Sequence, residues 1–204
     1  MAPEMEAVLA ELNARMSEEE RQRETLSGEE LEALRPQRML AIGEAAGRFV
    51  NLLVKTSGAR HILELGTSVG YSTLWLAEAA RATGGRVITI DENADKTRQA
   101  RDYMAAAGLA EVVEWVTGDA LETIAARPGP FDFVLLDLWK SAYVPCFEAF
   151  LPKLAPGALV AADNMTRPVT EHAPLYQQRV RGTPGMESLL VPIGNGVELS
   201  RYAP

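Results

Sequence analysis

Short apolar runs recur along the chain from about residue 60, and amphipathic stretches separate them. The runs are rich in β-branched and aromatic residues, which is typical of strands buried on both faces. The five predicted strands are His61–Leu65, Arg86–Asp91, Val112–Thr117, Phe131–Asp137 and Ala158–Asp163. The helices predicted after them are Ser72–Arg81, Ala94–Ala107, Ala120–Ala126, Ser141–Leu154 and one that follows Asn164. Because strands and helices alternate at this spacing, we expect right-handed crossovers and a parallel sheet.

The C-terminal pattern differs. Predicted strands Ser188–Val191 and Val197–Tyr202 flank Pro192–Gly196, where a Gly-Asn-Gly sequence favours a tight turn. The expected fold class is therefore α/β: a Rossmann-like, doubly wound, mostly parallel seven-stranded sheet with a C-terminal antiparallel hairpin and helices on both faces.

The N-terminal region reads as helical. Residues 4–35 are charged, with apolar positions at helical spacing, and Ser27 with Glu30 forms a capping-box pattern. Met39–Val54 is predicted as a further amphipathic helix. We expect residues 1–37 to be a helical extension and residues 38–204 to be the main domain.

Composition narrows the class of protein. Of the 204 residues, 47% are apolar and 24% are charged, which favours a soluble globular protein. No apolar run approaches the roughly 20 residues of a membrane span, and the acidic N-terminus lacks the basic region of a secretory signal. Cys146 is the single cysteine, which favours a reducing cytoplasm. A net charge of −8 without a basic cluster counts against nucleic acid, so we expect a small-molecule partner and neither membrane nor nucleic acid.

A glycine turn, residues 66–70, follows the first predicted strand. Gly66 would let the chain reverse and a ligand approach its backbone, and Ser72 could cap the next helix. The G-x-x-x-G spacing lacks the middle glycine that a dinucleotide pyrophosphate needs. Taken alone, the turn is equally well explained as a structural connection.

Two carboxylates follow at the next strand ends. Asp91 could accept hydrogen bonds from ribose hydroxyls, or be a solvated strand-end residue. Asp119 could border an adenine pocket, or cap the helix that starts at Ala120. Suitable groups at successive strand ends favour a nucleoside site.

The fourth and fifth predicted strands deliver Asp137, Lys140, Asp163 and Asn164. Two carboxylates and an amide oxygen are hard ligands suited to Mg²⁺. A lysine beside them could act as a general base near neutral pH. The alternative is two strand-end carboxylates that pair with Lys140.

These residues lie in sequences that resemble the cation-dependent O-methyltransferases, the family that includes catechol and caffeoyl-CoA O-methyltransferases. The resemblance covers about residues 38–202. The motifs that carry it are Glu-Leu-Gly-x-x-x-Gly-Tyr-Ser from Glu64, Asp137-x-Trp139-Lys140-x-x-Tyr143-x-Pro145, Ala162-Asp163-Asn164, and Pro192-Ile-Gly-Asn-Gly-Val197.

The resemblance implies a role for each matching position. It makes Lys140 the catalytic base. The implied ligands of Mg²⁺, or of another divalent cation, are Asp137, Asp163 and Asn164. S-adenosylmethionine is the implied cofactor, and its expected contacts, together with those read above, are Ile42, Glu64, Gly66, Thr67, Ser72, Asp91, Asp119, Ala120, Asp137 and Trp139. For Trp139, which matches a tryptophan beside the adenine, core packing is the alternative.

The sequence departs from the catechol enzyme at two places. Leu138 replaces a histidine that contacts the cofactor there. Glu187 has the spacing of a substrate-orienting glutamate, or simply begins the hairpin.

The reading that combines these features is transfer of a methyl group from S-adenosylmethionine to a hydroxyl of a small, catechol-like acceptor. A metal-independent methyltransferase, a nicotinamide-dependent oxidoreductase and a non-catalytic cofactor-binding protein are the alternatives. The missing middle glycine and the terminal hairpin count against the oxidoreductase.

Other conspicuous residues have simpler interpretations. We expect His61 to be structural and Cys146 to be buried and inert. His172 is solvated, caps a helix, or lines the acceptor pocket. The Arg21–Glu32 charge run is a solvated helix face that could also form the contact of a homodimer.

Overall fold

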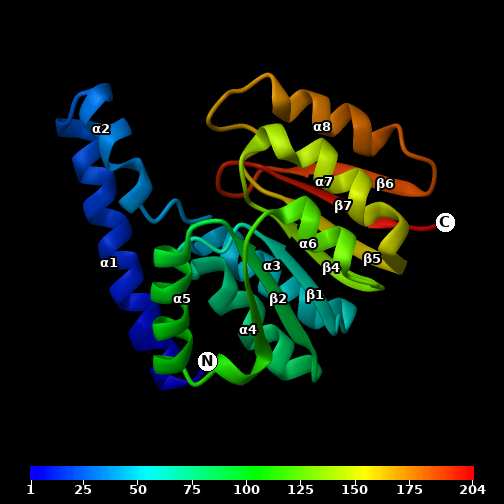
Figure 1. The fold of residues 1–204 in the computed structure, drawn as a ribbon, viewed down its shortest axis with the longest axis horizontal. Helices are drawn as coiled ribbons and strands as arrows, with labels where there is room; N and C mark the ends of the chain where they lie inside the picture. Colours follow the sequence, from blue (N-terminus) through cyan, green and yellow to red (C-terminus); the bar gives the residue numbers. More distant parts are fainter.

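A seven-stranded sheet forms the centre of the molecule (Figure 1), a computed structural model that describes residues 1–204 apart from the side chain of residue 35. The strand order is β3-β2-β1-β4-β5-β7-β6. The strands are β1 (His61–Leu65), β2 (Arg86–Asp91), β3 (Val113–Thr117), β4 (Phe131–Leu136), β5 (Leu154–Ala162), β6 (Met186–Val191) and β7 (Val197–Tyr202). Strands β1 to β5 pair in parallel, and β7 pairs antiparallel with both β5 and β6. The predicted sheet and hairpin are confirmed.

Helices cover both faces of the sheet. They are α1 (Pro3–Thr25), α2 (Gly28–Leu34), α3 (Glu44–Ser57), α4 (Tyr71–Thr83), α5 (Ala94–Ala106), α6 (Ala120–Ala126), α7 (Tyr143–Phe150) and α8 (His172–Arg181). Side chains alternate between the two faces, since Ile62 lies in the core beneath α3 and α4 while Leu63 lies in the core beneath α6 and α7. The doubly wound arrangement is therefore confirmed. Among the described residues, none of the helices has the length and apolar character needed to cross a membrane.

Three predicted boundaries were wrong by four residues or more. Residues 39–43 are not helical, and α3 begins at Glu44, because Leu40 and Gly43 have φ angles of 50° and 80°. Strand β5 begins at Leu154, where a helix was expected, because Leu154 pairs with Phe131 ahead of an irregularity in the β4–β5 register. The helix before it ends at Phe150, and residues 151–153 form a 3-10 turn.

The N-terminal helix α1 is packed into the main core. Met5, Val8, Leu9 and Leu12 are buried in the same cluster as side chains of α3 and α4. Figure 1 shows α1 running beside α5, and α2 standing away from the sheet at the end of α1. The Ser27–Glu30 capping box is confirmed: the Ser27 amide donates to Glu30 Oε2 at 2.9 Å and the Glu30 amide donates to Ser27 Oγ at 3.3 Å.

The predicted division at residues 37 and 38 can be tested through this packing. Replacing the fully buried Leu12 by Ala leaves a cavity in the shared core, so we expect Leu12→Ala to lower the free energy of unfolding by about 2–5 kcal/mol. Urea denaturation measures the change, with Leu52→Ala, at a side chain 62% exposed, as the control. An unchanged main transition for Leu12→Ala would mean that α1 unfolds separately from the sheet.

Candidate active site

The carboxyl ends of β2, β1, β4 and β5 meet at one edge of the sheet, the carboxyl edge. The register pairs Leu65 with Ile90 and with Leu136, and Leu136 with Ala162. The residues that end or follow these strands therefore lie level with one another: Asp91, Gly66, Asp137 and Asp163. Two backbone hydrogen bonds extend the ladder, from the Asp137 amide to Leu65 at 2.8 Å and from the Asp163 amide to Leu136 at 3.0 Å. The structure thus brings the predicted site residues to one edge.

The backbone that follows the neighbouring strand β4 leaves no room for a side chain at position 66, so Gly66 is required there. Its φ is +105°, and a Cβ placed on it would lie 2.1 Å from the Asp137 carbonyl oxygen. The group that approaches Gly66 in the structure is this protein carbonyl, and the approach of a ligand stays a prediction. Ser72 was wrongly predicted as a helix cap. It lies buried inside α4, whose N-cap is Gly70 with a φ of 89°.

Glu64 is fully buried beside the glycine turn. Its Oε2 accepts hydrogen bonds from the Thr73 and Thr89 hydroxyls, both at 2.6 Å, whereas Oε1 has no partner among the described residues. Burial raises the pKa of this carboxyl to about 7. The Thr67 hydroxyl lies 2.5 Å from that of Thr89, so it belongs to the same buried group. The strand that leads into the glycine turn therefore carries a buried carboxyl, that of Glu64, with one oxygen that lacks a hydrogen-bond partner among the described residues.

The two nucleoside candidates have different surroundings. Asp91 Oδ2 accepts the Ser68 amide at 2.7 Å and Oδ1 accepts the Asn93 amide at 2.8 Å, and the side chain is half-buried. Each oxygen keeps capacity for a second donor. Asp119 is exposed and accepts the Glu122 amide at 2.8 Å, so the helix-cap interpretation is confirmed. Ala120 is the first residue of α6.

Asp137 and Asp163 form a crowded pair of carboxyls. Asp163 is 1% exposed, and burial raises its pKa to about 6. Burial and the negative charge of Asp163 together raise the pKa of Asp137 well above its ordinary value. Lys140 makes no ion pair within 4.0 Å with any described residue, which counts against the interpretation of the three as a salt bridge. Burial lowers the pKa of the Lys140 ammonium.

The donor set suits a hard cation. Asn164 Nδ2 donates to Asp163 Oδ2 at 2.8 Å, so its Oδ1 is the end of the amide left for a cation. Asp163 Oδ1 is buried without a partner. No group of three or more His, Cys, Asp or Glu side chains placed to hold a metal is found among the described residues. The predicted ligands are two carboxylates, Asp137 and Asp163, and the amide oxygen of Asn164. Mg²⁺ accepts this combination of oxygen ligands.

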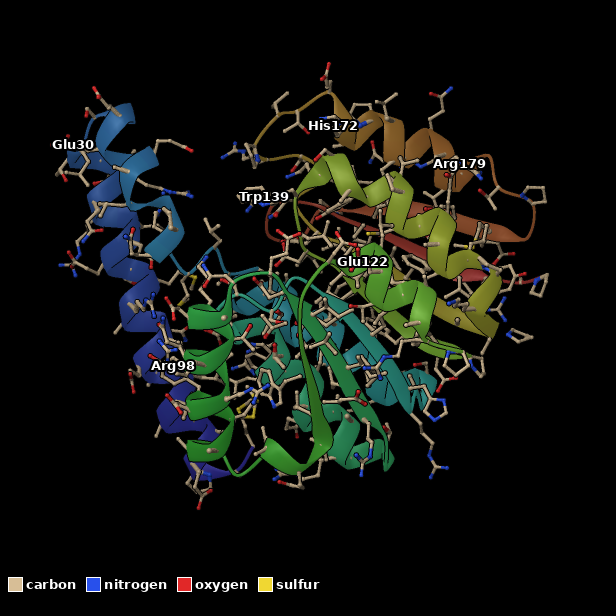
Figure 2. All side chains as sticks on the ribbon, viewed as in Figure 1. Glu30, Arg98, Glu122, Trp139, His172 and Arg179 are labelled. Carbon is tan, nitrogen blue, oxygen red and sulfur yellow. The ribbon has the colours of Figure 1, made fainter. Side chains whose placement is uncertain are left out.

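Lys140 borders a cavity of about 620 Å³ between α7 and α8. The other residues that line it are Ser141, Val144, His172, Leu175, Gln178, Arg179 and Gly182. His172 therefore lies on the same cavity as Lys140, as one of its three interpretations required. Figure 2 shows His172 at the start of α8 and Trp139 close to the start of α7. Trp139 is 57% exposed, so its interpretation as core packing was wrong.

Two other residues lie away from the site. Glu187, on β6, pairs with Arg201 at 3.8 Å and stands level with Leu159, four residues before Asp163, so it begins the hairpin. Cys146 is buried, and burial raises its thiol pKa to about 11, as expected of an inert residue. Apart from His172, the lining residues of α8 were missed, because residues 165–185 carry no recognisable motif.

Comparisons with known proteins agree with this geometry. A family model described as O-methyltransferase matches residues 13–202. The catechol O-methyltransferase of Niastella koreensis is 35% identical over 132 residues, which is 63% of this chain and 59% of that protein. The chain thus spans about three fifths of the length of this curated relative.

Solved structures give the same result. The O-methyltransferase TomG from Streptomyces achromogenes, in complex with SAM, is 30% identical with a TM-score of 0.73, covering 81% of this chain and 82% of that one. An O-methyltransferase from Bacillus cereus, in complex with SAH, is 25% identical with a TM-score of 0.78, covering 99% and 91%.

The raised pKa of Glu64 predicts a pH-dependent stability. Between its ordinary pKa of 4.5 and about 7, the unfolded chain releases the Glu64 proton first, so stability is present at low pH and falls as pH rises. At about 1.4 kcal/mol per pKa unit, Glu64→Gln should gain about 3 kcal/mol over the wild type from pH 4.5 to pH 8. Urea unfolding across this range measures the gain, with the exposed Glu122→Gln as control (Figure 2). A pH-independent difference would contradict the shift.

Proposed function

Because the chain belongs to the O-methyltransferase family, we propose that it transfers the methyl group of S-adenosylmethionine to a hydroxyl oxygen of a small acceptor. The observation that carries the proposal is the shared carboxyl edge, on which Gly66, Asp91, Asp137 and Asp163 lie level, with Lys140 and Asn164 following in sequence. Membership of this family counts against the nicotinamide-dependent alternative. It also makes a non-catalytic role the less economical interpretation of the site.

The cofactor would occupy the β2 side of this edge. Asp91 accepts the ribose hydroxyls, since each of its oxygens has capacity beyond one backbone amide. Asp119, Ala120 and the exposed ring of Trp139 border the adenine. The remaining expected contacts, Ile42, Glu64, Gly66, Thr67 and Ser72, surround the methionine part. Of these, Glu64 is fully buried, so it would act on the cofactor from beneath the glycine turn.

The metal would lie on the β4–β5 side. Asp137, Asp163 and Asn164 would hold Mg²⁺ or another divalent cation, which would supply a positive charge that favours the ionised form of the acceptor hydroxyl. The raised pKa values of the two carboxyls support this assignment, because two buried acids that repel one another are stabilised as anions by a cation.

Lys140 would take the acceptor proton. Its pKa is lowered by burial, which brings the neutral amine nearer to neutral pH. S-adenosylmethionine would supply the methyl group and leave as S-adenosylhomocysteine, and Lys140 Nζ would accept the proton that the acceptor hydroxyl loses. The rest of the rate enhancement comes from holding oxygen and methyl in line. A catechol-like acceptor suits the site, since two adjacent oxygens can chelate one cation.

The partner assignments extend this proposal. The acceptor enters from the cavity that Lys140 shares with α8. The exposed Arg21–Glu32 face is the proposed contact of a homodimer, and a cytoplasmic location is the proposed setting.

A methyl-transfer screen tests the reaction. Purified protein with methyl-labelled S-adenosylmethionine should label catechols, and fail with phenols that lack the second hydroxyl, in the presence of Mg²⁺. EDTA should abolish transfer and excess Mg²⁺ should restore it. Full activity in EDTA would favour the metal-independent alternative. No transfer to catechols, caffeoyl esters or flavonoids, with or without Mg²⁺, would contradict the proposed acceptor class.

Lys140→Ala tests the base. Loss of a positioned general base typically lowers turnover about 10²–10⁴-fold, while the dissociation constant of S-adenosylhomocysteine should be unchanged. Steady-state turnover and calorimetric titration measure the two quantities. Lys55→Ala, on the distant helix α3, controls for loss of a positive charge. Turnover of Lys140→Ala equal to that of Lys55→Ala would exclude proton transfer to Lys140.

A further inference from the structure

Glu19, near the end of α1, holds a segment that borders the glycine turn. Both of its carboxylate oxygens accept a hydrogen bond from the Met39 backbone amide, at 2.9 and 3.0 Å. Only 14% of the Glu19 side chain is exposed. A largely buried carboxylate loses most of its contact with water, so it needs hydrogen bonds from the protein. Because both of its oxygens accept from the Met39 amide, Glu19 restricts where that amide can lie.

The backbone of Met39 links Glu19 to the carboxyl edge. The Met39 carbonyl accepts a hydrogen bond from the Ser68 hydroxyl at 2.5 Å. Ser68 lies in the glycine turn, has a φ of 46°, and donates its amide to Asp91. One continuous chain of contacts thus joins Glu19, Met39, Ser68 and Asp91.

Charged neighbours hold the same segment, which we name the strap (residues 37–43). Arg15 donates to the Gln37 carbonyl at 2.8 Å and lies 3.4 Å from Glu19, and Arg38 lies 3.7 Å from Glu19. Lys96, on α5, is 8% exposed and interacts electrostatically with both Glu19 and Asp91. The strap therefore contacts α1 through Glu19 and Arg15, and it contacts the glycine turn through Ser68.

We propose that Glu19 is a positioning residue for cofactor binding, which acts by fixing the strap and, through Ser68, the Asp91 carboxylate. The inference rests on the proposed function, in which Asp91 and the strap residue Ile42 contact S-adenosylmethionine. With Glu19 in place, the strap is ordered before the cofactor arrives, so binding does not have to order it. Without Glu19, the Met39 amide is released and the Ser68 hydroxyl loses a fixed partner.

Calorimetric titration with S-adenosylhomocysteine tests the proposal. The free energy of a hydrogen bond to a charged group corresponds to a factor of about 10 to 100 in a dissociation constant. We therefore expect Glu19→Ala to raise the dissociation constant of S-adenosylhomocysteine by a factor in that range. Glu19→Gln, which keeps one acceptor for the Met39 amide, should fall between Glu19→Ala and the wild type. Glu20→Ala, an exposed acid next to it on the same helix, is the matched control and should bind as the wild type does.

Steady-state kinetics separates positioning from general stability. Glu19→Ala should raise KM for the cofactor, with kcat at saturating cofactor and KM for the acceptor within twofold of the wild type. A fall in kcat with an unchanged cofactor KM would overturn the proposal.

A double-variant cycle tests the route. Because Glu19 and Ser68 act through the same residue, Glu19→Ala combined with Ser68→Ala should weaken binding less than the product of the two single effects. Independent, multiplicative effects would overturn the connection through Met39. Where Glu19→Ala does not fold, Glu19→Gln takes its place in the cycle and in the kinetics.

Binding of S-adenosylhomocysteine distinguishes failure of the proposed function from failure of the proposed role of Glu19. A wild-type chain that does not bind S-adenosylhomocysteine would refute the proposed function. A wild type that binds, with Glu19→Ala binding within twofold of it, would refute the role of Glu19 alone.

Discussion

The approach of Gly66 to the Asp137 carbonyl sets the geometry of the whole carboxyl edge. A side chain at Gly66 would stand 2.1 Å from that oxygen, so no other residue lets β1 and β4 end side by side. The backbone bond from the Asp137 amide to Leu65 depends on the same spacing. This contact joins the two halves of the site, because the glycine turn follows β1 and the proposed metal ligands follow β4 and β5. The spacing between the glycine turn and Asp137 is thus fixed by the backbone.

That geometry crowds acidic groups into a poorly solvated place. Burial raises the pKa of Glu64 to about 7 and that of Asp163 to about 6, and it raises the pKa of Asp137 as well. Each shift is a free-energy penalty on the ionised, folded chain. Cores are normally built to avoid such groups, and sites that break the rule generally do so for function. Here the penalty falls on acidic groups that we propose as contacts of a cation and of a positively charged cofactor.

The sequence was a good guide wherever a local pattern decided the outcome. Strands β1, β2 and β7 have their predicted bounds, because short apolar runs between turn residues leave few alternatives. Asp137 and Asp163 could be placed together from strand order alone. The strap was missed because its conformation depends on partners far along the chain, Glu19 and Ser68. Glu19 itself looked like any other acid in a charged helix, and only the fold shows that it faces a backbone amide.

The packing of α1 also constrains how the chain folds. Tyr103 donates to Glu11 across 92 residues of sequence, and Arg15 donates to Gln99 across 84. Contacts of such long range form late, since loop-closure entropy must be overcome before they contribute. Docking of α1 therefore requires α4 and α5 to be in place, and the strap depends on α1 through Glu19. The strap thus depends on a helix that precedes the sheet in the sequence, whereas the strands pair only with one another.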